Sequence, residues 1–291
     1  MTLDPSLLSA TLALASAFLF ALSIQVQNLG LKHAEPRPGV VVNIGTTALV
    51  FWALSPLYLD SSYWLTPATA LFAIVGLFRP ALSVNLAVAG VKLMGPALTS
   101  GLAATNPLFA ACFAILLLGE KMTWPMAVGT LAVVGGVAIS AFRPGGMARG
   151  WPVWAITLPL GAAFFRALGH PLTMIGLADI PSPLFAGLIS YTVSIIVVYA
   201  AFRLEGRRMP TLTRGYLWFV LSGSLNGVSI YSLNSALAGG SLLTVAPIVA
   251  CSPLFTILLG HFVFRKEAIT GRTVATIALV VSGVILIIVN P

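Results

Sequence analysis

The fold is decided by residues 107–121, which read PLFAACFAILLLGEK. Pro107 interrupts a longer apolar segment, and the charged turn Gly119-Glu120-Lys121 closes it. A second run begins with Pro253-Leu254-Phe255, 146 residues later, and closes with Arg265-Lys266-Glu267. Two matching runs half a chain apart predict two copies of one structural unit.

The same offset of 146 residues recurs along the rest of the chain. It pairs Leu14 with Leu160, Ala17 with Ala163, Phe18 with Phe164, Gly30 with Gly176, Thr130 with Thr276 and Val134 with Val280. A register that holds from end to end indicates an internal duplication. We therefore expect one repeat in residues 1–146 and a second in residues 147–291, joined near Gly145-Gly146.

The composition is that of an integral membrane protein. Hydrophobic residues make up 58% of the chain and charged residues 8%, and the mean hydropathy is +1.02. Soluble domains carry about 25% charged residues. No polar stretch is long enough to form a soluble domain, so membrane lipid is the expected surrounding of the whole chain.

The net charge of +8 does not indicate a nucleic-acid-binding protein, because the basic residues lie in short loops between apolar segments, where positive charge sets topology. Cys112 and Cys251 lie inside apolar segments at non-equivalent positions, as expected of small buried residues rather than a disulfide or metal pair. Residues 1–5 carry no basic group, so we expect the first apolar segment to remain as a helix rather than be cleaved.

Ten segments reach the length of about 20 mostly apolar residues that a spanning helix needs. They are residues 7–30, 38–58, 67–91, 95–118, 122–142, 151–175, 182–203, 214–236, 241–264 and 270–290. Since each repeat has an odd number of helices, the second copy enters the membrane from the opposite side. The predicted fold is an all-α bundle of ten transmembrane helices, two inverted five-helix repeats around a central cavity, which is an architecture of alternating access.

Prolines fall inside several of these spans, at Pro80, Pro107, Pro159, Pro171, Pro247 and Pro253. Each removes a backbone hydrogen bond that protein or water must replace. Such a proline is either an ordinary packing kink or part of a functional hinge. Because Pro107 and Pro253 are equivalent in the two repeats, a shared hinge or curved cavity wall is an open alternative there.

All seven acidic residues lie in termini, in loops or at helix ends: Asp4, Glu35, Asp60, Glu120, Asp179, Glu205 and Glu267. Without a carboxylate in mid-membrane, the chain has no aspartate cluster for magnesium, and it has no His-Glu-x-x-His metal site. We expect no catalytic residues, no metal and no cofactor. An intramembrane enzyme is the least favoured of the function classes considered.

Two positive charges, in contrast, fall near the middle of spans. Arg79 lies midway along the third segment and Arg166 near the centre of the sixth, too deep to reach the membrane surface easily. His170 follows Arg166 by four residues, on the same helix face. Each arginine either caps carbonyls freed beside Pro80 or Pro171, or lines an aqueous cavity and attracts an anionic group.

Uncharged polar residues provide further candidates for substrate binding. They are Asn85 in the third segment, Tyr191 in the seventh, and Asn226 and Tyr231 in the eighth, which is also rich in serine. Gln25 and Asn43 lie in the first two segments. A buried amide is also a common interhelical hydrogen-bonding group, and deep aromatic residues are also core packing, so both interpretations remain open.

The tandem five-helix layout, with a proline-containing fourth helix that ends in Gly119-Glu120-Lys121 and a glycine-rich fifth, resembles the EamA type of the drug/metabolite transporter superfamily. The resemblance covers essentially the whole chain, although the second repeat has Phe264-Arg265-Lys266-Glu267 where a Gly-Glu is expected. It implies a multi-pass protein of the bacterial inner membrane that exports amino acids or other small metabolites. The most similar group is the aromatic amino-acid exporters.

We therefore expect a secondary transporter of a small-molecule substrate, with a passive channel or facilitator as the alternative. The orientation follows from the loops. Odd-numbered loops carry twelve Lys and Arg residues, whereas even-numbered loops carry only Lys121. The positive-inside rule then places both termini outside, whereas the resemblance implies many relatives with cytoplasmic termini. We follow the positive-inside rule and predict that both termini lie outside.

Overall fold

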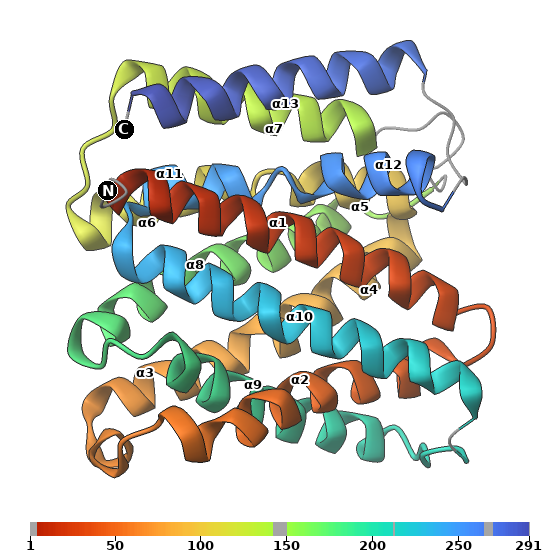
Figure 1. Cartoon of the computed structure of the whole chain (residues 1–291). Helices are drawn as coiled ribbons and strands as arrows, with labels where there is room; N and C mark the ends of the chain where they lie inside the picture. The colour runs from red at the N-terminus through yellow and green to blue at the C-terminus, as the bar shows by residue number, and fades with distance from the viewer. Residues whose placement is uncertain (1–4, 142–149, 212, 265–269, 291) are drawn as a thin grey trace.

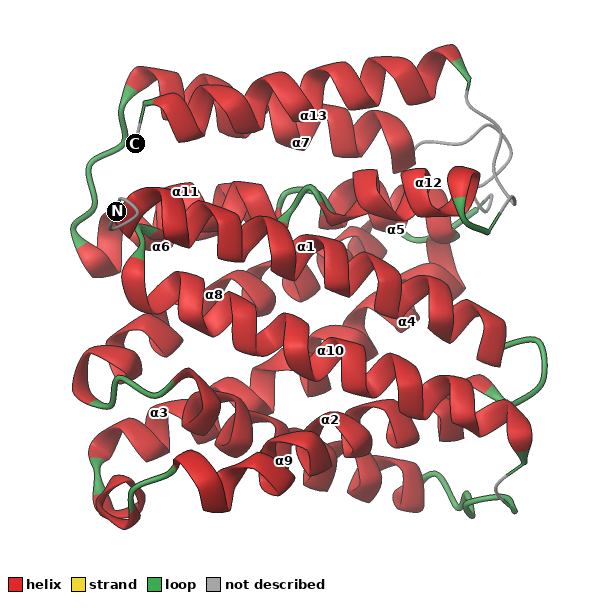
Figure 2. Ribbon diagram, in the orientation of Figure 1, coloured by secondary structure: helices red, strands yellow, loops and turns green. Residues whose placement is uncertain are grey.

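The computed structural model describes residues 5–141, 150–211, 213–264 and 270–290, and within them the chain forms helices joined by short turns (Figure 1, Figure 2). No strand occurs in this described part of the chain. The predicted all-α fold is confirmed. The predicted boundary between the repeats, at residues 146 and 147, lies outside the described residues.

The first half contains five spans, three of them single helices. Its elements are α1 (Pro5–Gly30), α2 (Pro36–Tyr58), η1 (Ser61–Leu65), α3 (Pro67–Gly76), η2 (Leu77–Leu82), α4 (Ser83–Met94), α5 (Pro96–Ala103), α6 (Asn106–Leu118) and α7 (Trp124–Ala141). The third span is α3, η2 and α4 in succession, and the fourth is α5 followed by α6.

The second half has the same order of spans. Its elements are η3 (Val153–Ile156), α8 (Thr157–Asp179), α9 (Pro183–Leu204), α10 (Arg214–Gly239), α11 (Leu242–Val249), α12 (Ser252–Phe262) and α13 (Gly271–Val289). The eighth span, the counterpart of the broken third, is the single helix α10, whereas the ninth span is α11 followed by α12. The expected sixth segment, residues 151–175, is shifted along the chain, because residues 153–156 form the short 3₁₀ helix η3 and the α-helix begins only at Thr157.

The fourth and ninth spans are interrupted at the same place. An offset of 146 residues maps α5 onto α11 from end to end, and both α6 and α12 carry a proline, Pro107 or Pro253, in their first turn. A proline there needs no N–H partner and starts a helix. The sequence predicted single helices over 95–118 and 241–264. Each is in fact two helices, because the proline begins a new helix rather than bending an old one.

Eight spans in the described residues are long and apolar enough to cross a membrane. The other two of the ten, α8 and α10, have spanning length but are more polar. They carry Arg166 and His170 (α8) and a row of serines and asparagines (α10). Helix α10 packs against α1, α2, α9 and α8, and α8 packs against α3, α4, α5 and α6. The two polar helices thus each pack against four other helices, while one face of α10 stays exposed.

Helices α7 and α13 pack together along one edge of the bundle, and α2, α3 and α9 form the opposite edge (Figure 1). Helix α1 begins and α13 ends at one end of the bundle, which we call the terminal end. The described basic loop residues Lys32, Arg37, Lys92, Arg203, Arg207, Arg208, Arg214 and Arg272 lie at or next to helix ends on the other side, which we call the basic end. Lys121 lies at the terminal end.

Candidate functional site

The third span bends at Arg79 and Pro80, inside η2. Arg79 has extended backbone angles (φ −134°, ψ 117°) within an otherwise helical segment. Pro80 has no N–H, so it cannot donate to the carbonyl of Gly76. The hydroxyl of Ser194 on α9 replaces that donor, with an Oγ–O distance of 2.6 Å to Gly76, and also lies 3.2 Å from the carbonyl of Arg79.

The Ser194 hydroxyl hydrogen-bonds to these carbonyls. The side chain of Arg79 therefore does not need to cap them and extends to another helix. Arg79 Nη1 lies 3.2 Å from Nδ1 of His170 on α8. The arginine stem crosses α8 over Gly169, where an added Cβ would be 3.6 Å from Arg79 Cδ. A guanidinium has donors only, so Nδ1 of His170 accepts and the imidazole is neutral.

Arg166 lies one helical turn before His170, on the same face of α8. His170 is 3% exposed, whereas both arginines are partly exposed. We call Arg79, Arg166 and His170 the arginine site. The sequence placed these three residues together as candidates, and the structure brings them together from two different spans.

Tyr191 and Asn226 adjoin the arginine site. Tyr191 lies one turn before Ser194 on α9, and Ser194 contacts the carbonyl of Arg79. That hydroxyl accepts a hydrogen bond from Asn226 Nδ2 at 3.0 Å, and the same Nδ2 lies 3.2 Å from Thr47 Oγ1. Tyr191 and Asn226 were both predicted as candidates. Their contact leaves the Tyr191 O–H free to donate to a solute.

Two aromatic rings flank the same region. Phe78 directly precedes Arg79, and Phe165 directly precedes Arg166. Their rings are stacked, with centroids 5.2 Å apart and planes at 29°. Phe165 in turn contacts Phe164 edge-on at 5.4 Å. The stacked pair thus joins the third span to α8 one residue before each arginine.

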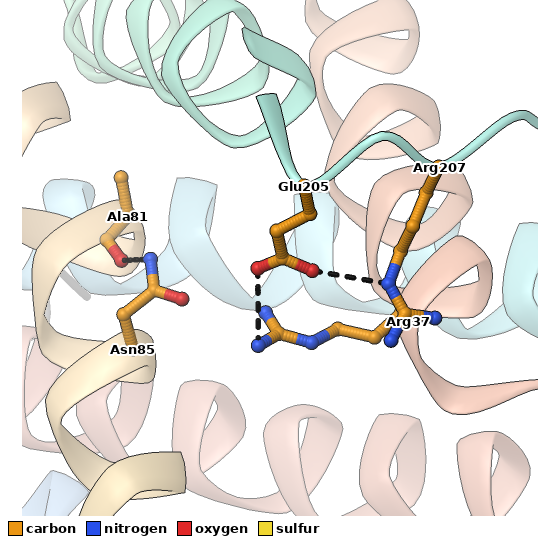
Figure 3. Close-up of polar contacts among 5 residues, drawn as sticks. All are labelled: Arg37, Ala81, Asn85, Glu205 and Arg207. Carbon is orange, nitrogen blue, oxygen red and sulfur yellow. Dashed lines mark hydrogen bonds and ion pairs between the residues drawn. The ribbon is translucent and has the colours of Figure 1, made fainter. Parts of the chain in front are cut away.

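Two other predicted site residues lie apart from this cluster. Asn85 is exposed, and its amide donates to the carbonyl of Ala81 in its own helix at 2.9 Å (Figure 3). Tyr231 is 45% exposed and lines a cavity of about 470 Å³ beside Phe51 and Tyr63. No hydrogen bond in the described part of the chain joins either residue to the arginine site.

Several of the other buried polar side chains connect helices. Asn43 donates to Ser222 Oγ at 2.7 Å, and Gln25 donates to the carbonyl of Thr256 at 2.7 Å. Ser229 donates to the carbonyl of Ser16 at 2.8 Å. These residues hold α1 against α10 and α12, and α2 against α10, so they act as interhelical hydrogen bonds rather than as ligands.

Ser194 and Thr47 are the residues of the site that the sequence did not single out. Each is one hydroxyl among many in apolar helices. The only local signal was Pro80, which predicts a carbonyl in need of a donor four residues earlier but not the helix that supplies it. Ser194 is 115 residues away in the chain.

A second cavity, of about 540 Å³, opens near the terminal end between α1, α7, α8, α10 and α11. Met174 and Leu177 of α8 line it, and Met174 is one turn beyond His170. We call it the terminal cavity. Neither cavity is lined by Arg79 or Arg166. The face of α8 that carries Arg166, His170 and Met174 runs from the arginine site toward the terminal cavity.

The profile of the EamA-like transporter family matches the chain twice, over residues 7–142 and 153–289. The chain belongs to this family. It is therefore a helical membrane protein of a transporter family, and the two matches fall on the two halves that the offset of 146 relates.

No curated protein sequence matches the chain. Among solved structures, 29 chains match. One of them, titled "Crystal structure of protein", is similar over 96% of both chains with a TM-score of 0.80 and 19% sequence identity. At that identity the likeness of this EamA-like chain to it concerns the fold.

Proposed function

We propose that this EamA-like protein is a secondary transporter that exports small organic solutes bearing a carboxylate or similar anionic group across the bacterial inner membrane. Amino acids, aromatic ones in particular, are the leading class. The observation that carries the proposal is the 3.2 Å contact between Arg79 and His170 with Arg166 one turn away. All three lie in the middle of their spans.

The charge balance of the arginine site favours an anion. Arginine stays protonated, and its planar fork matches a carboxylate. No acidic residue lies within any of the predicted spans away from their ends, so the chain supplies no buried counter-charge. His170 is neutral and accepts from Arg79, which orients that guanidinium without neutralising it. A bound anion supplies the missing charge.

The stacked rings of Phe78 and Phe165 support an aromatic solute. Each ring is adjacent in sequence to one of the arginines, and the rings lie 5.2 Å apart. An aromatic group packs well against such faces. The Tyr191 hydroxyl, which already accepts from Asn226, offers a donor for a further solute oxygen.

The inverted architecture supports alternating access rather than an open pore. Two related repeats surround a midplane site, and the fourth and ninth spans are broken at equivalent residues. Broken helices of this kind let one repeat move against the other. The competing function is a passive channel or facilitator, which has the same helices but does not couple binding to a conformational change.

Counterflow in proteoliposomes distinguishes a secondary transporter from a passive channel or facilitator. Vesicles loaded with unlabelled phenylalanine should transiently accumulate labelled phenylalanine from the medium, and the initial rate should saturate. Phenylpyruvate, which keeps the ring and carboxylate, should compete, whereas phenethylamine, which lacks the carboxylate, should not. Flux that rises linearly with concentration without counterflow would indicate a channel, and competition by the amine alone would contradict the anion site.

A further inference from the structure

Glu120, in the turn that closes the first repeat's broken span, contacts the second repeat directly. Its Oε1 accepts from the backbone N–H of Leu242 at 2.7 Å. Its Oε2 accepts from the N–H of Leu243 at 2.9 Å and from the Ser241 hydroxyl at 3.0 Å. One carboxylate thus accepts three hydrogen bonds from the start of α11.

The local sequence explains how Glu120 comes to contact α11. Gly119 ends α6 in the left-handed conformation (φ 67°), which turns the chain toward α11. The first N–H groups of a helix lack partners within the helix, and its N-terminus favours a negative charge. Leu242 and Leu243 are 0% and 2% exposed, so their N–H groups depend on the carboxylate rather than on water.

The contact forms part of the wall of the terminal cavity. Glu120 lines that cavity together with Leu243 and Thr244 of α11 and with Met174 and Leu177 of α8. Since Met174 follows His170 by one turn, the cavity lies between the terminal end and the arginine site. At this cavity α8 faces α11, which Glu120 ties to the first repeat.

The equivalent contact cannot form at the basic end. The offset of 146 residues pairs Glu120 with Lys266, Ser241 with Gly95 and Leu242 with Pro96. Lysine has no acceptor, glycine has no hydroxyl and proline has no N–H. Glu267 stands one position later, but two of the three donors would still be missing. The sequence therefore offers this acceptor and this full set of donors at one end of the bundle only.

We propose that Glu120 is a one-sided latch that holds α11 against the first repeat and keeps the passage from the arginine site to the terminal end closed. The inference rests on the proposed alternating-access function. Because the sequence offers no matching acceptor and donor set at the basic end, the carboxylate stabilises one of the two related conformations over the other. Its release is the step that opens the terminal end.

Cysteine labelling tests the latch without any solute. In a variant that lacks Cys112 and Cys251, Leu177→Cys reports on the terminal cavity and Thr99→Cys, buried in α5, reports on general loosening. E120Q and E120A are combined with each reporter, and the rate of reaction with a membrane-impermeant maleimide is measured in detergent. E205Q is the matched control, because Glu205 pairs with Arg37 and Arg207 at the basic end.

E120Q and E120A should each raise the labelling rate at position 177 by about tenfold or more, because bonds to a charged group are among the stronger ones, while position 99 stays unreactive. E205Q should change neither rate. An unchanged rate at position 177, or an equal rise at both positions, overturns the latch. If E120Q and E120A leave the labelling rate at position 177 unchanged while the protein still shows counterflow, the latch is contradicted and the proposed transport function is not. If the Glu120 substitutions raise the labelling rate at position 177 but the unsubstituted protein shows no counterflow, the proposed function is contradicted and the latch is supported as a structural switch.

Discussion

The hydroxyl of Ser194 lies 2.6 Å from the carbonyl oxygen of Gly76, an acceptor to which Pro80 cannot donate. This bond crosses from α9 to the bend in the third span. It stabilises the extended backbone at Arg79 and leaves the guanidinium free to contact His170. A serine in the second repeat therefore sets the position of a charge in the first.

Ser194→Ala should reduce both stability and transport. Removing the hydroxyl deletes its buried hydrogen bonds to the carbonyls of Gly76 and Arg79, and one such bond contributes about 0.5–1.5 kcal/mol. The measurement is thermal unfolding in detergent together with the transport rate in proteoliposomes.

Ser190→Ala is the matched control. Ser190 is also buried on α9 and donates to the carbonyl of Phe72 at 3.0 Å, but Phe72 lies inside α3, where a helical N–H is available. Its loss should cost less than that of Ser194. Equal effects of the two substitutions would show that the Pro80 bend is not what Ser194 supports.

Tyr191→Phe should raise the KM for an anionic solute several-fold while the protein remains folded. The substitution removes the hydroxyl that Asn226 contacts beside Arg79, and one hydrogen bond contributes about 0.5–1.5 kcal/mol. Tyr231→Phe serves as its control, because Tyr231 lines the other cavity. If Tyr231→Phe raises the KM more than Tyr191→Phe does, the solute binds in the cavity that Tyr231 lines rather than at the arginine site.

The spans and their duplication could be predicted from the sequence because both are local signals. Twenty apolar residues predict a span wherever they occur, and the offset of 146 residues is visible in residue identities alone. For Pro107 and Pro253 the sequence left a packing kink and a shared hinge or curved cavity wall as alternatives, and it did not predict that each begins a separate helix. Whether a proline bends a helix or begins a new one depends on the preceding turn, which hydropathy does not describe.

The site was predictable only in part, because partners across the bundle are not encoded in local spacing. Arg79, Arg166 and His170 stood out as costly charges and polar groups in mid-membrane. Asn85 looked equally suitable, yet its amide bonds to Ala81 one turn away in its own helix. Glu120 was recognised as the end of a helix, but nothing near it in sequence indicates α11, more than 120 residues later.

Gly223→Ala should destabilise the bundle. An added Cβ would lie 2.4 Å from the carbonyl oxygen of Asn43 and 2.8 Å from Thr46 Cβ, so α2 and α10 would be forced apart. Overpacking of this kind costs about 1–3 kcal/mol. Gly135→Ala, where nothing lies within 4 Å, should leave the unfolding temperature unchanged. A tolerated Gly223→Ala would argue against close α2–α10 packing.

Both termini should lie outside the cell. The described basic loop residues gather at the basic end, and the termini belong to the other end, where Lys121 lies. Positive loops stay in the cytoplasm. A C-terminal alkaline phosphatase fusion should be active, and a fluorescent-protein fusion at the same position should be dark. Bright cells with an inactive phosphatase would reverse the orientation and move the Glu120 latch to the cytoplasmic face.

The most direct test of the account is the rate of phenylalanine counterflow in proteoliposomes containing R166Q or R166K, each shown to be folded by its unfolding temperature. Arg166 should bind the solute carboxylate through its planar fork, which lysine cannot reproduce. We expect kcat/KM to fall at least about tenfold in R166Q, because a hydrogen bond to a charged group contributes about 1.5–3 kcal/mol, and R166K to recover little of the loss. Counterflow by R166Q at the rate of the unsubstituted protein would contradict an anion-binding arginine site.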